Sequence, residues 1–426
     1  MTVRSPMVDR WSGRAGRRAA NHGGAVVIGG DYRALGVVRS LGRRGIPVWV
    51  LKDEHGLAAT SRYTRRTLPW PPLEESRQID YLLDLGAQHR IDGWVLFPSG
   101  DEAAALLAHH HAVLSERFRL TVPPWEVTRW AYDKRLTYRL AMEVDVDLPW
   151  TRYPASREVV AALDCPFPVI LKPAHKARQL NRLTAAKAWR VDDRQALLAR
   201  YDEACTLVAP DQIILQESIP GGGEVQFSYA ALCLDGRPLA SVVARRTRQY
   251  PVDFGRASTY VETVNQPEVE GAACRLLAAI RYTGLIEVEF KRDPRDSRYK
   301  VLDMNPRVWG WHTLGQRAGV DFPYLLWRLI RDEPVPEVQT RTDVRWVRIL
   351  TDLLAAAGEM RRGALSPRAY LRSLQGPLEF AIFAADDPLP ALVDIPLLVL
   401  LGGKRLSISC RNRLGVAARA ELNGLS

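Results

Sequence analysis

Two runs of alternating side chains, separated by a turn, occupy residues 284–307 and constrain the fold more than any other stretch of this sequence. The first run predicts a strand with one apolar face, carrying Ile286, Val288 and Phe290, and one largely acidic face, carrying Leu285, Glu287 and Glu289. In the second run, Leu302 and Met304 alternate with Val301, Asp303 and Asn305. The intervening residues 291–300 contain the Pro, Asp and Ser of a connecting turn, so we expect a hairpin.

Folded in this way, the hairpin brings Glu289, Asp303 and Asn305 to one surface. Carboxylate and amide oxygens suit magnesium, which phosphoryl-transfer sites hold with one or two carboxylates and substrate phosphates. The alternative is an exposed hairpin whose acidic face merely neighbours arginines, because charged outer faces are ordinary on antiparallel strands.

Composition limits the class of protein. A chain of 426 residues, 47% of them hydrophobic, can build two or three compact domains. Its five cysteines show neither a CxxC pair nor the Cys/His spacing of a zinc site, which favours a reducing, cytoplasmic compartment. The net charge of +11 favours anionic ligands, but the arginines lack the interleaved aromatics of a nucleic-acid platform, so nucleic acid is not the favoured partner. The sequence does not indicate an oligomeric state.

The N-terminal part predicts a parallel α/β domain over residues 23–125, preceded by a flexible basic tail over residues 1–22. A strand from Ala25, a helix over 34–44 and a strand over 47–51 form a βαβ unit. A further strand at 94–97 leads to Ser99 and Glu102, which have capping-box spacing. Glycines 29 and 30, with Asp31 and Ser99, could meet an anion at the strand ends, or could simply build a tight turn.

A second, α+β domain is expected over residues 126–335, after Pro123-Pro124 and beginning with a helix over Val127–Glu143. Residues 336–426 form a C-terminal extension of unknown role. Within it, residues 389–401 are strongly apolar but too short for a bilayer span. This pattern favours a buried helix or strand over contact with a membrane surface.

The order of motifs makes a family resemblance specific. Asp303-Met-Asn-Pro-Arg307 resembles the E-x-N-P-R stretch at the metal-binding end of ATP-grasp enzymes, with aspartate in place of the usual glutamate. Over residues 23–335 the chain looks most like carbamoyl phosphate synthetase-like and D-aspartate ligase-like members. The resemblance implies an ATP-grasp fold and metal ligation of Mg²⁺, with Mn²⁺ as the alternative ion, by Glu289, Asp303 and Asn305. Arg307 would stabilise the charge that develops during reaction.

The same resemblance implies an ATP site. Gln216, Glu217 and Ile219 match the hinge whose main chain reads the adenine edge, and Glu224 matches the ribose-binding acid. Lys134 and Lys172 match lysines aimed at the nucleotide phosphates. After Lys172, a basic segment stands where many members carry a glycine-rich flap; it contains His175, Lys176, Arg178 and Arg182.

Candidate substrate groups follow. Residues 244–258 read as an arginine-rich loop, in which Arg245, Arg248 and Arg256 could bind a substrate carboxylate or simply be surface charge. His312, with Trp309 and Trp311, could line an acceptor pocket or pack in a core.

The activity implied by this resemblance is an ATP- and magnesium-dependent ligase that activates a small carboxylate as an acyl phosphate and joins it to an amine, forming an amide or peptide bond. Two alternatives stay open. The first keeps the ATP site but uses a thiol acceptor or bicarbonate as the donor. The second is a nucleotide-binding protein without catalysis.

Overall fold

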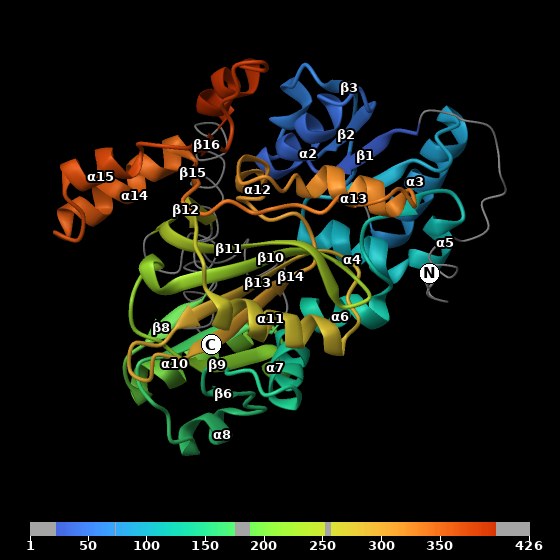
Figure 1. Cartoon of the computed structure of the whole chain (residues 1–426). Coiled ribbons are helices and arrows are strands. Elements are labelled where there is room, and N and C mark those ends of the chain that lie inside the picture. The colour runs from blue at the N-terminus through green and yellow to red at the C-terminus, as the bar shows by residue number, and fades with distance from the viewer. Residues whose placement is uncertain (1–22, 73, 175–187, 252–256, 398–426) are drawn as a thin grey trace, which may run out of the picture.

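The computed structural model describes residues 23–72, 74–174, 188–251 and 257–397. The N-terminal domain, blue in Figure 1, stacks against a large central sheet, and a smaller sheet lies at the far end of the molecule. The chain therefore consists of one parallel α/β domain, one large and mainly antiparallel sheet with its helices, and a small antiparallel lobe, and the predicted hairpin lies in the large sheet.

The N-terminal sheet has the strand order β3-β2-β1-β4-β5 and is parallel throughout. Its strands are β1 (Ala25–Ile28), β2 (Val48–Lys52), β3 (Thr64–Pro69), β4 (Val95–Pro98) and β5 (Arg119–Leu120). The helices of this domain are α2 (Tyr32–Gly42), η1 (Ala58–Thr60), α3 (Glu75–His89), α4 (Asp101–His109) and α5 (His111–Ser115). The predicted open parallel domain is confirmed.

Strand β1 shows why this domain needs cover on both faces. Ala25 and Val27 join the core that faces the large sheet, whereas Val26 and Ile28 join the core formed with α3 and α4. An apolar run buried on two sides is typical of parallel strands. The predicted capping box is not formed, because Gly100 is the N-cap of α4 and has no side chain to accept a hydrogen bond.

The small lobe is an antiparallel sheet with the order β6-β9-β7-β8. Its strands are β6 (Thr151–Arg152), β7 (Val169–Pro173), β8 (Trp189–Val191) and β9 (Ile213–Glu217). It is accompanied by α8 (Arg157–Ala162), α10 (Arg194–Cys205) and η2 (Pro210–Gln212). The side chains of β7, β9 and α10 share one core.

The large sheet has the order β14-β13-β10-β11-β12-β15-β16. Its strands are β10 (Gln226–Leu234), β11 (Arg237–Tyr250), β12 (Ala257–Thr263), β13 (Gly284–Arg292), β14 (Tyr299–Asn305), β15 (Arg345–Val347) and β16 (Leu378–Phe380). Helix α11 (Pro267–Ala279) packs in the core on one face, while α12 (Thr313–Arg317) and α13 (Phe322–Ile330) share the other core with the N-terminal domain. The turn η3 (Gly223–Val225) leads from the small lobe into β10.

The helix predicted over Val127–Glu143 is divided in two. Helix α6 (Trp125–Tyr132) ends at Asp133, whose extended backbone breaks the helix and whose side chain accepts a hydrogen bond from the Arg135 backbone N–H at 2.9 Å. Helix α7 (Lys134–Glu143) follows. This cap places Lys134 at the first position of α7, which periodicity alone did not predict.

The C-terminal extension has a structural role in the described residues. It supplies β15 and β16 to the large sheet, and α14 (Ile349–Arg361) with α15 (Pro367–Ser373) forms the arm at the left of Figure 1. Asp387 fastens the extension to the N-terminal domain: it accepts hydrogen bonds from Arg39 Nε at 2.9 Å and Ser61 Oγ at 2.7 Å. The carbonyl groups of Ile382 and Asp387 accept two further hydrogen bonds from Arg39.

The apolar segment near the C-terminus differs from its prediction. Residues 389–397 are helical, but Leu389, Leu392 and Ile395 are 51%, 70% and 55% exposed, while Asp394 is buried. The predicted burial is wrong for these three side chains because the buried aspartate, 3.7 Å from Arg348, turns the apolar side outward. Residues 398–401 lie outside the described part. Within that part, no helix combines the length and apolar character needed to cross a membrane.

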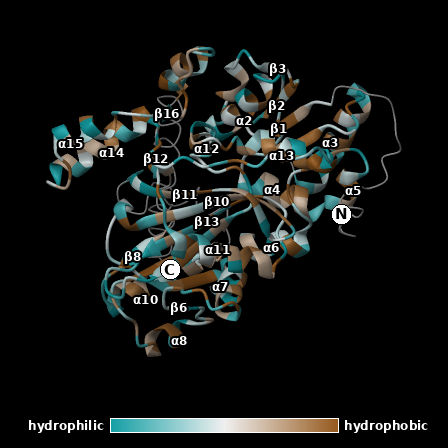
Figure 2. Ribbon diagram, in the orientation of Figure 1, coloured by the Kyte–Doolittle hydropathy of each residue, from teal (hydrophilic) through white to brown (hydrophobic). Residues whose placement is uncertain are grey.

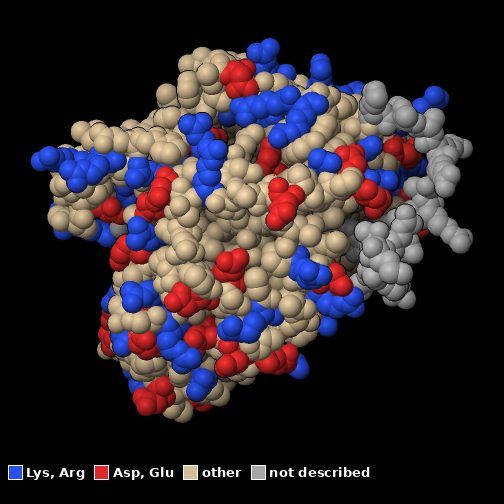
Figure 3. Space-filling model, in the orientation of Figure 1, with Lys and Arg blue, Asp and Glu red and all other residues tan. Residues whose placement is uncertain are grey.

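Hydropathy and charge follow this arrangement. Figure 2 shows hydrophobic residues concentrated along the strands and on the inner sides of the helices. On the face shown in Figure 3, acidic and basic side chains interleave over the lower half, and basic side chains gather at the tip of the α14–α15 arm. The excess positive charge on this face therefore lies mainly in its upper half, at the top of the molecule and at the tip of the arm.

We expect Asp387→Ala to destabilise the protein strongly, because it leaves Arg39, which is 5% exposed, without its carboxylate partner. Removing one member of a buried ion pair costs about 3 kcal/mol of unfolding free energy. Urea unfolding followed by tryptophan fluorescence measures the loss. Asp386→Ala is the matched control, since Asp386 is 42% exposed in its pair with Arg43 and should cost less than about 1 kcal/mol. Equal losses in the two variants would contradict the anchoring role of Asp387.

Candidate active site

The hairpin of β13 and β14 forms the predicted polar face. Glu289 lies directly opposite Asp303, and Glu287 lies opposite Asn305, in an antiparallel register. Residues paired across adjacent strands point to the same side of the sheet. These four side chains therefore share one face, and the apolar side chains of β13 point the other way into the core beneath α11.

A bulge in this hairpin corrects one predicted orientation. After the pair of Glu289 with Asp303, the next pair joins Phe290 to Val301, so that the register skips Leu302. Val301 consequently lies in the core with Met304, although strict alternation predicted it on the polar face. The prediction was wrong because an inserted residue reverses the alternation locally.

Each candidate metal-binding carboxylate has a cationic neighbour. Glu289 forms an ion pair with Arg246 and accepts a hydrogen bond from Asn305 Nδ2 at 2.8 Å, and Asp303 lies 2.6 Å from Lys134 Nζ. Among the described residues, no three His, Cys, Asp or Glu side chains are grouped to hold a metal. The set that fits a hard cation is thus two carboxylates and one amide carbonyl, which suits Mg²⁺ shared with phosphate oxygens.

Glu287 belongs to this face, although the sequence indicated no role for it. Its side chain is 4% exposed and accepts hydrogen bonds from Trp311 Nε1 at 2.9 Å and Asn305 Nδ2 at 3.1 Å. Burial, together with the charge of Glu289, raises the pKa of Glu287 to about 7. Alternation predicted the face of Glu287, but no local pattern predicted that Trp311 would cover it.

Lys172 reaches the same region from the small lobe. Its Nζ donates hydrogen bonds to Gln216 Oε1 at 2.8 Å and to the Tyr138 hydroxyl at 2.9 Å. Burial lowers the pKa of Lys172 to about 8, although the nearby charges of Asp303 and Glu289 act in the opposite direction. The lysine is therefore close to losing its charge at a pH not far above neutrality.

The predicted hinge connects the small lobe to the large sheet. Glu217, at the end of β9, accepts hydrogen bonds from the Trp150 backbone N–H at 3.0 Å and from Lys300 Nζ at 3.2 Å, and also pairs with Arg295. Burial acts to raise the pKa of Glu217, but these donors lower it below its ordinary value. The carboxylate side chain of Glu217 is thus engaged within the protein. The backbone N–H groups of Glu217 and Ser218 are also engaged, since they donate to the carbonyl oxygens of Trp150 and Pro168, each at 2.9 Å.

Lys291 is a hinge residue that the sequence did not indicate. Its Nζ donates to the carbonyl oxygens of Ile219 at 2.8 Å and Gly221 at 2.7 Å. Glu224 lies exposed in η3 and accepts a hydrogen bond from the Gly222 backbone N–H at 2.8 Å. Lys291 therefore ties the hinge to β13, the strand that also carries Glu289.

Arg307 is held by a carboxylate of the N-terminal domain. Its Nε and Nη2 donate to the two oxygens of Asp101 at 2.9 and 3.0 Å, and Nη2 also donates to Asn305 Oδ1 at 3.1 Å. A further bond runs from Nη1 to the Val308 carbonyl at 3.1 Å. The bidentate pair fixes the plane of the guanidinium beside the predicted metal-binding residues.

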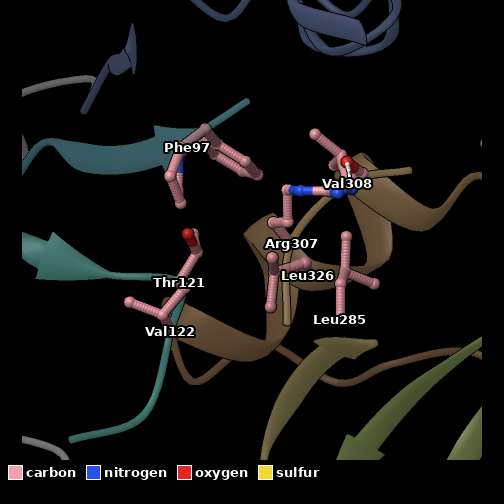
Figure 4. A pocket seen from close by; sticks show the side chains of 8 residues that line it. Phe97, Thr121, Val122, Leu285, Arg307, Val308 and Leu326 are labelled. Atoms are coloured by element: carbon pink, nitrogen blue, oxygen red, sulfur yellow. Dashed lines mark hydrogen bonds between the residues drawn. The ribbon is translucent and has the colours of Figure 1, made fainter. Parts of the chain in front are cut away.

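A small cavity adjoins Arg307 at the junction of the N-terminal domain and the large sheet (Figure 4). Its volume is about 10 Å³, which is close to the space of a single water molecule. It is lined by Phe97, Pro98, Thr121, Val122, Leu285, Arg307, Val308 and Leu326. The pair of Arg307 with Asp101 therefore lies beside a largely apolar junction, where an unpaired charge would be costly.

The predicted substrate arginines do not meet the hairpin face. Arg245 pairs with Glu262 at 2.6 Å on the opposite face of β11, and Arg248 is 3% exposed and pairs with the buried Asp352 at 2.8 Å. Arg256 lies outside the described residues. The arginine that does reach the face is Arg246, and counting alternate positions along β11 from the apolar Ala244 could have indicated it.

His312 and its tryptophan neighbours pack in the interior. The His312 side chain is 1% exposed, its Nδ1 lies 2.8 Å from the Trp309 carbonyl oxygen, and burial lowers its pKa to about 4. Trp309 is fully buried and packs at a tilt against Trp311, with ring centroids 5.5 Å apart. The structure thus matches the core-packing alternative for these residues rather than an open pocket.

The glycine turn after β1 also has a structural explanation. Gly29 has a φ of +112°, and a Cβ at this position would come within 2.0 Å of Ser99 Oγ. Asp31 caps α2 by accepting a hydrogen bond from the Arg33 backbone N–H at 2.9 Å, and it also pairs with the Arg33 side chain. These contacts match the tight-turn alternative. The basic segment with His175, Lys176, Arg178 and Arg182 lies outside the described residues.

Comparison with known proteins shows similarity to ATP-grasp enzymes. Residues 211–351 match the family described as "ATP-grasp in the biosynthetic pathway with Ter operon". The chain is 22% identical over 311 residues to the carbamoyl phosphate synthase large chain of Thermomicrobium roseum, covering 69% of this chain and 28% of that protein. It is 26% identical over 234 residues to the D-aspartate ligase of Enterococcus faecium, covering 50% of this chain and 53% of that protein. The chain thus spans no more than about half of the length of these two curated relatives.

The fold is shared more widely than the sequence. The crystal structure of an L-amino acid ligase from Bacillus licheniformis superposes with a TM-score of 0.57 at 15% identity, covering 76% of this chain and 78% of that one. The matched family segment contains the hairpin of Glu289, Asp303 and Asn305. The family match over residues 211–351, the relatives and the common fold together confirm the predicted resemblance to ATP-grasp enzymes.

Proposed function

We propose that this protein is an ATP- and magnesium-dependent ligase that activates a small-molecule carboxylate as an acyl phosphate and couples it to an amine. The observation that carries the proposal is the polar face of the β13–β14 hairpin. There Glu289, Asp303 and Asn305 lie together, Lys134 contacts Asp303, and Arg307 contacts Asn305. Carboxylates, lysines and a fixed arginine such as Arg307 on a single face are the groups that a polyphosphate and its metal ion require.

The roles follow from the chemistry of each group. Glu289, Asp303 and Asn305 would hold Mg²⁺, which supplies charge neutralisation at the phosphate oxygens when bound. Lys134 and Lys172 would orient the phosphates, since a compact ammonium tolerates oxygens that shift during transfer. Arg307, fixed by Asp101, would stabilise negative charge that develops on the transferred group or on the tetrahedral intermediate.

The nucleotide base would lie between the small lobe and the large sheet, against the hinge main chain at residues 216–219. Gln216 is 2% exposed and Ile219 is 4% exposed, so a slot for the base would have to form beside these buried side chains. Glu224, which is exposed in η3, is available for the ribose hydroxyls. Such a slot with a few main-chain donors and acceptors is what an adenine requires.

The names of the similar proteins support a carbon–nitrogen ligase. A carbamoyl phosphate synthase large chain, a D-aspartate ligase and an L-amino acid ligase are all among them. The four described cysteines, Cys165, Cys205, Cys233 and Cys274, are free thiols, in keeping with the proposal of a reducing cytoplasmic compartment. The acid and the amine are left for experiment, because fold does not determine substrate.

The proposal is tested by measuring ADP and phosphate release from the purified protein with Mg-ATP and a panel of amino acids and small carboxylates. Substrate-dependent ADP formation with an amide product by mass spectrometry supports the ligase. A thioester or carboxylated product would instead support a thiol acceptor or bicarbonate donor. Nucleotide binding without turnover across the panel would favour a non-catalytic protein, and absence of nucleotide binding would refute the proposal.

Burial lowers the pKa of Lys172 to about 8. We therefore expect nucleotide affinity to fall as the pH rises through about 8. The ammonium is charged below this pH and neutral above it, and only the charged form attracts phosphate. Calorimetric titration with ADP over a pH series measures the effect. Lys172→Arg should remove this dependence because arginine stays protonated. A wild-type affinity that is constant across this range would contradict the proposed phosphate contact.

Arg307→Met should lower kcat by about a hundredfold, because a fixed cation beside developing charge acts mainly in the transition state. The dissociation constant for ADP should change by less than about threefold, since the ground-state nucleotide relies on the lysines and the hinge. Steady-state kinetics with the substrates identified in the panel, together with ADP titration, separate the two effects. A large loss of ADP affinity with unchanged kcat would assign Arg307 to nucleotide binding instead.

Asp303→Asn should abolish turnover while leaving the thermal unfolding midpoint close to that of the wild type, because Asp303 is a partly exposed ligand rather than a core residue. Mn²⁺ binding in the presence of ADP, measured by electron paramagnetic resonance, should weaken in parallel. Retained activity in a folded Asp303→Asn protein would remove this residue from the metal site.

A further inference from the structure

Arg246 occupies a position on the hairpin face that no family motif predicted. It lies on β11, where Val242 and Ala244 pack in the core that faces the N-terminal domain. In the sheet register, Ala244 is opposite Ser228, and Ser228 is opposite Glu289. Arg246, two residues beyond Ala244, therefore points to the same side as Glu289 and crosses the intervening strand to reach it.

The guanidinium of Arg246 is held on two sides. It forms an ion pair with Glu289, and its Nε donates a hydrogen bond to Ser258 Oγ at 2.7 Å. The residue is 8% exposed. Burial lowers the pKa of an arginine, but the neighbouring charges of Glu289 and Glu287 raise that of Arg246 by more, so that it stays protonated. Arg246 is thus a permanent positive charge at one candidate metal ligand.

In this structure both candidate ligand carboxylates are already neutralised from within the chain. Arg246 pairs with Glu289, and Lys134 pairs with Asp303 at 2.6 Å. A divalent metal ion that binds without a nucleotide would have to displace Arg246 and Lys134 from the two carboxylates. Their positive charges would also repel the metal ion strongly, because the site is partly buried and the distances are short. A nucleotide brings its own negative charge, which offers Arg246 and Lys134 phosphate oxygens in exchange for the carboxylates.

We propose that Arg246 is an internal counter-ion that keeps divalent metal out of the Glu289 site until a nucleotide binds, and so makes metal and nucleotide binding mutually dependent. This inference rests on the proposed function, because it concerns the same metal and nucleotide. It assigns to Arg246 a positioning role: it sets the charge and orientation of Glu289.

Two neighbours of Arg246 supply the controls. Arg245 is adjacent in the chain and is also paired with an acid, Glu262, but it lies on the opposite face of the sheet and is 41% exposed. Arg245→Met therefore removes an equal charge without touching Glu289. Arg246→Lys keeps the charge and should behave like the wild type, which separates loss of charge from disturbance of packing.

The test measures Mn²⁺ binding by electron paramagnetic resonance, with and without ADP, in the wild type, Arg246→Met, Arg245→Met and Arg246→Lys. Without ADP, Arg246→Met should bind Mn²⁺ about tenfold more tightly than the wild type, because a repelling and competing charge is gone. The gain in Mn²⁺ affinity caused by ADP should shrink by about the same factor, since the coupling is reciprocal. Arg245→Met and Arg246→Lys should match the wild type within about twofold.

Each other result has a separate meaning. Unchanged or weaker Mn²⁺ binding by a folded Arg246→Met protein, as judged by its thermal unfolding, overturns the counter-ion role. Equal tightening in Arg245→Met also overturns it, because the effect would then come from net charge alone. If Arg246→Met does not fold, Arg246→Gln replaces it: this variant keeps a polar side chain beside Ser258 but removes the charge that faces Glu289, and an unchanged ADP-induced gain in a folded Arg246→Gln protein overturns the proposal. Failure of the wild type to bind Mn²⁺ even with ADP would instead refute the proposed function.

Discussion

The pairing of Glu289 with Asp303 across β13 and β14 determines where every other group of the site has to lie. Two carboxylates on adjacent strands repel each other unless cations or a metal ion come between them. The apolar reverse face of the hairpin, packed beneath α11, prevents the strands from turning to relieve that repulsion. The protein instead brings Arg246 from β11 and Lys134 from the start of α7 to the two acids.

This constraint explains why the site draws on distant parts of the chain. Lys134 reaches Asp303 because Asp133 ends α6 and caps α7, which places Lys134 at the start of α7. Tyr138, also on α7, donates a hydrogen bond to the Leu302 carbonyl at 2.8 Å. Lys291 continues β13 beyond Glu289 and binds the hinge carbonyls. One strand therefore carries both a candidate metal ligand and the lysine that contacts the hinge carbonyls.

The sequence predicted the structure correctly where a residue's orientation depends only on its neighbours in the chain. Strand alternation predicted the hairpin and the common face of Glu289, Asp303 and Asn305, since each residue's orientation depends only on its neighbours. Prediction from the sequence failed where a side chain's position depends on an inserted residue in a strand or on a contact with a distant part of the chain. The bulge at Leu302 reversed the position of Val301, and the partner of Arg307 lies 206 residues away in the N-terminal domain. Arg246 was missed because residues 244–258 were predicted to be a loop, whereas residues 244–250 belong to strand β11, where alternation from Ala244 indicates its face.

The ion pair of Arg307 with Asp101 gives the N-terminal domain a part in the proposed chemistry. Arg307 is only 10% exposed on its side chain and adjoins a junction lined largely by apolar residues, so its charge needs a fixed partner there. Asp101 stands in the first turn of α4, where the helix dipole stabilises a negative charge. The carboxylate in turn holds the guanidinium plane against Asn305. The orientation of the proposed charge-stabilising group is therefore set by one domain, while the oxygens proposed to hold the metal belong to the other. The proposed site thus requires the two domains to be packed together.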